Sequence, residues 1–135
     1  MNDTSHFQQL LQAAAVQAEP QRLLFVFTAA ELPDRASPIE RERFHAGEGG
    51  ALTPLMCVDK APGELSDFEA LLAESRRAGP PWQVVFAASL AGSGGKPPAK
   101  AQIDAALESM VRTIGEGGGG RFAAYATTGA HLDFH

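Results

Sequence analysis

Two glycine-rich stretches have the composition of loops that bind phosphate through backbone N–H groups. The stretch Gly92-Ser93-Gly94-Gly95-Lys96 follows an apolar segment and precedes a helical one, as a phosphate-binding loop does. That motif also requires glycine at position 90 and serine or threonine at position 97, where this chain has Leu90 and Pro97. The run 115–120 fits G-x-G-x-x-G but follows a helical segment, which reverses the dinucleotide-binding order. Both stretches are therefore predicted to be connections.

An anion could also bind between the first of these loops and the end of another apolar segment. Asp59 and Lys60 follow the segment 51–58, and Ser93 and Lys96 follow the segment 82–90. If both segments are parallel strands, these side chains lie at one carboxyl edge of the sheet, where open α/β sheets bind ligands. Asp59, Lys60, Ser93 and Lys96 are therefore the candidate ligand-binding residues. The alternative interpretation is a pair of solvated loops.

Three residues near the end of the chain have the types of metal ligands. His131, Asp133 and His135 alternate, so on a strand their side chains point to the same face. Two imidazoles and a carboxylate could supply three ligands of a zinc site. A polar face on a terminal strand is ordinarily solvated, however, so we expect no bound metal and no cofactor.

Nucleophilic catalysis has two candidate residues. Ser93 lies one residue away from a G-x-S-x-G nucleophile motif, and Asp133 and His135 follow it in the hydrolase order. Two residues on one strand stand side by side, however, whereas a triad needs the carboxylate behind the imidazole. Cys57 lies in an apolar segment with Asp59 close by, which predicts a buried, inert thiol. We therefore assign no catalytic residue.

The composition limits the classes of protein. The 135 residues, 44% of them apolar, suffice for one domain over 1–135 with its own core. The net charge is −5, and the 11 basic residues are scattered, which argues against nucleic-acid binding. A single cysteine excludes an intramolecular disulfide. The start of the chain lacks a signal-peptide pattern, and the longest apolar run, 23–30, is far below the ~20 residues that span a bilayer. A cytoplasmic protein with no membrane partner is predicted.

Apolar periodicity and capping signals place four helices and five strands along the chain. Ser5 with Gln8 and Ser37 with Glu40 are capping boxes, and Gly79 before two prolines is a stop signal. The predicted helices cover residues 7–18, 38–44, 66–77 and 103–114, and the predicted strands cover 23–27, 51–58, 82–90, 121–127 and 130–134.

The order of these elements predicts an α/β fold. Strands that are apolar on both faces and alternate with helices are typical of βαβ units. We therefore expect a single-domain mixed sheet of about five strands, parallel in the middle, with helices packed on it and an antiparallel hairpin at the C-terminal end. With a turn at Thr128-Gly129, Tyr125 faces Leu132 and Ala123 faces Phe134 in that hairpin.

Three stretches resemble a known family. They are Gln21-Arg22-Leu23-Leu24-Phe25-Val26-Phe27, Gly49-Gly50-Ala51-Leu52-Thr53-Pro54-Leu55-Met56-Cys57-Val58-Asp59-Lys60 and Gly79-Pro80-Pro81-Trp82. The chain thereby resembles, over nearly its whole length, a family of small proteobacterial proteins often labelled "ribonucleotide reductase subunit alpha". The resemblance implies no specific activity. The radical chemistry of a reductase needs a cysteine pair and a third, thiyl cysteine, whereas this chain has one cysteine.

The sequence leaves three hypotheses for function. The first is a non-enzymatic association or regulatory domain, because a chain able to fold carries no complete catalytic motif. The second is a small-ligand or anion-binding regulatory domain, and the third is a minor enzyme. For the first we expect a two-fold homodimer, since residues 130–135 contain neither lysine nor proline to protect a sheet edge. In the alternative arrangement the hairpin lies inside the sheet and 51–58 is an edge protected by Pro54.

Overall fold

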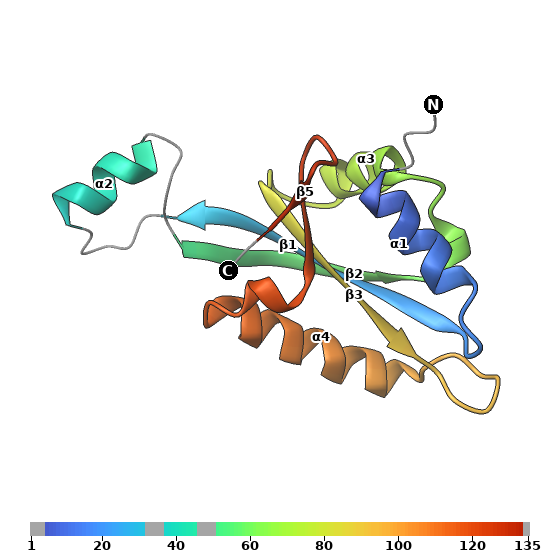
Figure 1. The fold of residues 1–135 in the computed structure, drawn as a ribbon. Coiled ribbons are helices and arrows are strands. Elements are labelled where there is room, and N and C mark those ends of the chain that lie inside the picture. Colours follow the sequence, from blue (N-terminus) through green and yellow to red (C-terminus); the bar gives the residue numbers. More distant parts are fainter. Residues whose placement is uncertain (1–4, 32–36, 46–50, 134–135) are drawn as a thin grey trace.

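The computed structural model describes residues 5–31, 37–45 and 51–133 and places their strands in one sheet (Figure 1). The strands are β1 (Gln21–Glu31), β2 (Ala51–Lys60), β3 (Val84–Ala91), β4 (Ala123–Ala126) and β5 (His131–Leu132). The α-helices are α1 (His6–Ala15), α2 (Pro38–His45), α3 (Phe68–Ala78) and α4 (Lys100–Gly115), and the short 3₁₀ turns are η1 (Pro62–Glu64) and η2 (Gly119–Arg121). None of the described helices is long and apolar enough to cross a membrane.

The sheet has the strand order β2-β1-β3-β4-β5, and every neighbouring pair is antiparallel. The predicted parallel centre is therefore wrong. β2 and β3 do run in the same direction and are joined by α3, but β1 lies between them and pairs with both. The chain leaves β1, passes through α2 and returns beside β1, so this connection is not a crossover. The strand–helix–strand pattern alone does not distinguish the two arrangements.

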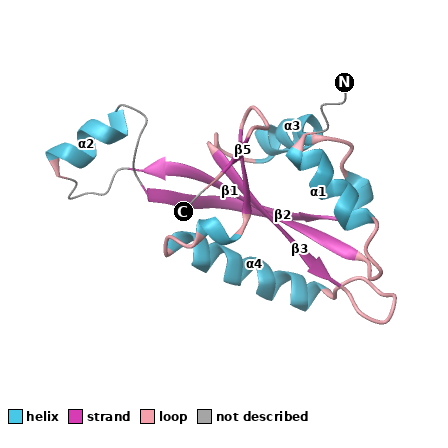
Figure 2. Cartoon of the chain, in the orientation of Figure 1, coloured by secondary structure: helices cyan, strands magenta, loops and turns pink. Residues whose placement is uncertain are grey.

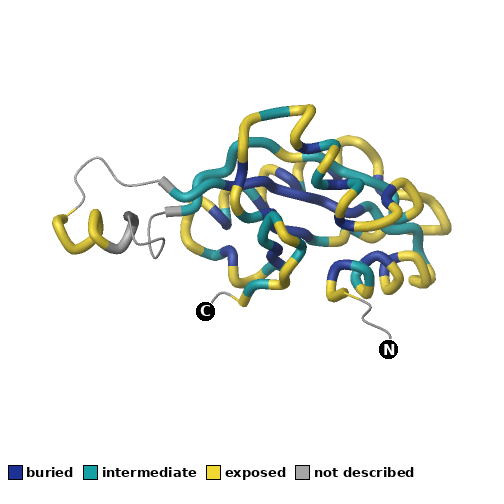
Figure 3. The backbone as a smooth tube through the Cα atoms, turned by 90° about the horizontal axis from the view of Figure 1, so that it is seen from above, coloured by how far each residue is buried: buried dark blue, intermediate teal, exposed yellow. Residues whose placement is uncertain are grey.

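Helices cover both faces of the sheet, as Figure 2 shows, and this explains why β1 is apolar on both faces. Leu23, Phe25 and Phe27 point toward α1 and α3, while Leu24 and Val26 point toward α4. Each set belongs to a separate buried cluster. Figure 3 shows buried backbone concentrated along the central strands. Burial on both faces was predicted correctly, but it requires helices on both sides rather than parallel strands.

Local capping signals locate most helix starts. Ser5 Oγ accepts from the backbone N–H of Gln8 at 3.0 Å, as predicted. The Ser37–Glu40 capping box is also present, with both of its hydrogen bonds. At α3 the cap is Asp67 rather than Ser66, since the Asp67 carboxylate accepts from the Ala70 N–H. Four residues are enough to define each of these caps, which is why sequence reading succeeds there.

The C-terminal hairpin exists, but its register differs from the prediction. Ala124 lies opposite Leu132 and Tyr125 lies opposite His131. The Ala126 N–H donates to the Ala130 carbonyl, which leaves a three-residue loop that ends at Gly129 with φ +88°. A two-residue turn was predicted, and this slip of one residue exchanges the faces of the hairpin. His131 therefore shares a face with Tyr125. Phe134 lies outside the described residues.

Candidate functional site

A groove lies between β2 and α4 on one face of the sheet. Its volume is about 570 Å³. β2 forms its floor through Cys57, and α4 forms its wall through Asp104, Leu107, Glu108, Val111 and Arg112. The spacing of the apolar residues in α4 determines which of its residues form this wall. Ile103, Leu107, Met110 and Ile114 bury one stripe of α4 against the sheet, so the stripe beside it borders the groove.

β2 lies at the edge of the sheet and pairs with β1 alone among the described residues. Pro54 lies at a bulge, because the register changes from Phe27–Met56 to Thr28–Pro54 and leaves Leu55 as the extra residue. Pro54 therefore lies both on an edge strand and at a bulge, two places where a residue without a backbone N–H is tolerated. From Met56 to Lys60 the register is regular, and this regular part contains the residue that faces the groove.

Side chains alternate along this regular part of β2. Met56 and Val58 pack with the cluster under α1 and α3. Cys57 points to the opposite face, into the groove, and is exposed, so the predicted buried thiol is wrong in that respect. Partial burial in the groove raises the pKa of the Cys57 thiol, and the carboxylates of Asp59 and Asp104 raise it further. The thiol therefore stays protonated at neutral pH, in accord with the inert residue that was predicted.

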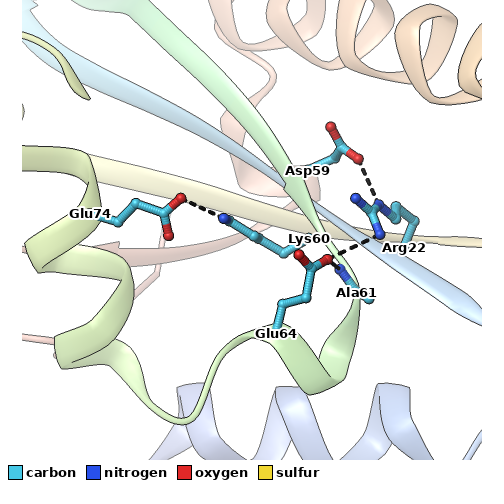
Figure 4. Close-up of polar contacts among 6 residues, drawn as sticks. All are labelled: Arg22, Asp59, Lys60, Ala61, Glu64 and Glu74. Atoms are coloured by element: carbon cyan, nitrogen blue, oxygen red, sulfur yellow. Dashed lines mark hydrogen bonds and ion pairs between the residues drawn. The ribbon is translucent and has the colours of Figure 1, made fainter. Parts of the chain in front are cut away.

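Asp59 and Lys60, predicted to bind a ligand together, point to opposite faces of β2 and are held in separate ion pairs (Figure 4). Asp59 Oδ2 lies 2.6 Å from Arg22 Nε, and the same guanidinium reaches Glu64 Oε1 at 3.1 Å. Lys60 Nζ contacts Glu74 of α3 at 2.5 Å. The positive charge that would attract an anion is therefore already neutralised by Glu74.

Ser93 and Lys96 close a tight turn. Each backbone N–H of the pair donates to the other's carbonyl at 3.0 Å, and the intervening Gly94 and Gly95 have φ of +60° and +78°. The Gly95 N–H donates to the Glu19 carboxylate at 2.7 Å. The loop is a connection, as predicted, and the one anion that receives its Gly95 N–H is a side chain of the same protein.

The predicted convergence of these loops is partly correct. Lys60 and Ser89 both lie opposite Leu23, so the ends of β2 and β3 are at the same end of the sheet. β1 separates them, however, because the two strands are not neighbours. Asp59 and Lys60 lie on one side of β1, and Ser93 and Lys96 follow from the strand on its other side.

Two of the three metal-ligand candidates, His131 and Asp133, lie in the described part of the chain, and neither belongs to a group able to hold a metal ion there. The His131 ring stacks on His6 of α1, with 3.7 Å between centroids and 3° between planes. Among the described residues no group of three or more histidine, cysteine, aspartate or glutamate side chains is placed to hold a metal ion. Asp133 is exposed, and His135 lies outside the described residues.

His6 and Tyr125 are functional candidates that sequence reading missed. His6 Nδ1 lies 2.7 Å from the hydroxyl of Tyr125, a residue buried between α1 and α3. Burial raises the pKa of Tyr125 to about 12, so its hydroxyl keeps its proton. The two residues are 119 positions apart, and no local pattern links them. The groove, by contrast, has a weak signal in the charged residues Lys100, Asp104, Glu108 and Arg112, spaced four apart on one helix.

Comparison of the chain with models of protein families, with curated proteins and with solved structures found no match to any of them. The β2–α4 groove and the sheet edge beside it are the features of the described structure that bear on function.

Proposed function

We propose that this protein is an association domain that binds an extended segment of a partner protein at the edge of β2. The partner segment adds to the sheet as a further strand, and its alternate side chains enter the β2–α4 groove. Strand addition beside a helix-walled groove is a recurring mode of peptide recognition, in which backbone hydrogen bonds give affinity and the groove gives specificity. The observation that carries the proposal is the coincidence of an unpaired edge with a groove of about 570 Å³.

The dimensions of the two elements support this mode. The regular part of β2, Met56 to Lys60, would pair with about five partner residues, roughly 17 Å of strand. α4 has 16 residues and is therefore about 24 Å long, enough to line that whole length. β2 and β3 finish at the same end of the sheet, and Figure 1 shows α4 beginning at that end and running back beneath the strands. The helix thus runs antiparallel to the strand along the groove.

The groove has the chemistry expected for a side chain that is apolar or positively charged. Leu107 and Val111 form its apolar part, next to the Cys57 thiol. Asp104 and Glu108 lie beside them, and Asp104 is paired with Lys100 at 2.6 Å. In the described part of the chain Glu108 forms no ion pair. A partner side chain with an apolar stem and a basic end would bury the stem and pair with Glu108.

Charges along α4 both oppose and favour a second copy of the chain at the groove. In a two-fold arrangement centred on Glu108, the middle of the groove lining, two antiparallel α4 helices would place Glu108 opposite its own copy and Asp104 opposite Arg112. The first contact joins like charges and opposes association, whereas the second joins opposite charges and favours it. The two-fold homodimer expected from the sequence therefore stays a separate prediction, to be tested by the mass in solution.

The anion-binding and enzyme hypotheses have less support. Glu74 neutralises Lys60, Glu19 occupies the Gly95 N–H, and the pKa of the single thiol is raised. None of these features favours a phosphate ligand or a nucleophilic reaction.

The proposal is tested by selecting peptides that bind the protein from a random display library. NMR of the protein with each selected peptide then maps the residues that the peptide contacts. We expect amide shifts over residues 55–60 and along the groove side of α4. The Val111→Asp variant should weaken binding by roughly tenfold or more, because it places a carboxylate against the partner's apolar group. Ser109→Asp is the matched control, since Ser109 lies about 200° around the helix from Val111. Failure to select any peptide, or shifts confined to another surface, would refute the proposal.

A further inference from the structure

The start of α1 is joined to the C-terminal hairpin by a cluster of three rings. His6 stacks on His131 with 3.7 Å between centroids and an interplanar angle of 3°. Both rings tilt against Tyr125, at 5.6 Å and 5.7 Å. His6 comes from α1, Tyr125 from β4 and His131 from β5. The cluster thus connects the first described helix to the last described strand of the sheet.

Proton binding changes two contacts of this cluster. When neutral His6 carries its hydrogen on Nε2, Nδ1 offers a lone pair and the buried Tyr125 hydroxyl donates to it. A protonated imidazole has N–H groups on both nitrogens, so Nδ1 then donates to the Tyr125 oxygen and the direction of this hydrogen bond reverses. Protonation of both stacked rings would also place two positive charges face to face. This repulsion opposes the closed arrangement.

We propose that the stacked pair His6 and His131 is a pH-sensitive latch that holds the terminal hairpin against α1 and opens when the histidines are protonated. Among the described residues, the titratable groups that face His6 are His131, Tyr125 and Asp133. Burial and the charge of His131 lower the pKa of His6, in that order, and Asp133 opposes them. The lowered pKa means that protons bind the open form more tightly. Closure is therefore complete above the ordinary imidazole pKa of 6.5 and is lost as the pH falls below it.

Opening would expose the outer edge of β4. β5 covers that edge through the pairs Ala124–Leu132 and Tyr125–His131. Only two residues of β5 take part, so the latch supplies a large share of what holds the hairpin in place. An acidic compartment or medium would then convert a covered edge into one able to pair with another chain. This inference does not depend on the β2–α4 groove.

Amide hydrogen exchange of the whole protein at pH 7.5 and pH 5, expressed as protection factors, tests the latch. The amides to follow are Gln9, which donates to Ser5, and Ala126, which donates to Ala130. Protection should be lower at pH 5 than at pH 7.5, because the pKa of His6 is lower in the closed form than in the open form. His131→Phe keeps a flat ring without a titrating nitrogen, and its loss of protection in acid should be smaller, because only His6 of the stacked pair can still take up a proton. The control His45→Gln removes a histidine of α2 and should behave as the wild type does.

A second variant keeps the test decisive if His131→Phe does not fold. Asp133→Asn removes the carboxylate that stabilises protonated His6, so the loss of protection in acid should become larger. Equal protection at the two pH values in the wild type would overturn the proposal. A pH dependence that persists unchanged in His131→Phe or that is reduced in Asp133→Asn would do the same.

Discussion

Replacing Gly119 by alanine should destabilise the protein through a single steric contact. Gly119 is buried in η2, directly after α4, which forms the wall of the groove. A Cβ atom at this position would lie 2.8 Å from Cε1 and Cζ of Phe86. Phe86 is fully buried in the α4 cluster, so its ring has no free space to move into. Overpacking of this kind costs about 1–3 kcal/mol.

Thermal unfolding followed by circular dichroism measures this effect, at roughly 4 °C of Tm per kcal/mol for a chain of this length. Gly63→Ala is the matched control, because no heavy atom lies within 4 Å of the Cβ it would add. It should leave the free energy of unfolding unchanged or raise it by up to about 1 kcal/mol, because alanine lowers the conformational entropy of the unfolded chain. The double variant Gly119→Ala with Phe86→Leu should lose less stability than the two single variants lose in sum, because the smaller leucine leaves space for the added methyl group. Additive costs, or a neutral Gly119→Ala, would refute the steric reasoning.

Three further predictions concern a buried hydrogen bond, the groove thiol and assembly. Ser75→Ala should lower the free energy of unfolding by about 1–3 kcal/mol and alter the fluorescence of the single tryptophan, because Trp82 Nε1 donates to Ser75 Oγ at 2.8 Å inside the core. Unchanged stability and emission would contradict this role of the hydrogen bond. Asp104→Asn should lower the pKa of Cys57 and speed its reaction with a disulfide reagent at pH 8, and an unchanged or slower reaction would show that Asp104 does not act on the thiol. Light scattering at micromolar concentration should give the mass of a two-fold dimer if the sequence-based expectation holds, and a monomer mass would exclude it.

Sequence reasoning succeeded where structure depends on near neighbours in the chain. The caps at Ser5 and Ser37 need only a residue and its partner three positions later. The buried stripe of α4 needs only a repeat of three to four residues. The strand pairings are different, because β1 runs between β2 and β3 and pairs with residues up to 70 positions away, such as Ala91 with Gln21. Alternating apolar residues indicate that both faces of β1 are buried, but they contain no information on the direction of its neighbours.

The prediction of the candidate sites was limited by the same lack of long-range information. Asp59 and Lys60 were expected to follow a strand but are the last two residues of β2. Their partners Arg22 and Glu74 could not be assigned from spacing. The three-residue loop before Ala130 rather than a two-residue turn decided which way His131 points. Its contact with His6 follows from that register and from the position of α1, neither of which the terminal sequence contains.

The two edges of the described sheet differ in how they are protected from other chains, and this difference bears on where the proposed partner strand would add. The β5 edge is two residues long, and its His131 is packed on α1. Short edge strands resist pairing. β2 is ten residues long, with Pro54 and the bulge interrupting its first half. Lys60, which could protect the second half, is turned to the opposite face from the groove and bound to Glu74. Within the residues that the structure describes, Met56 to Asp59 beside the groove has neither proline, bulge nor lysine to protect it, and a strand added there would gain backbone pairing and side-chain burial together.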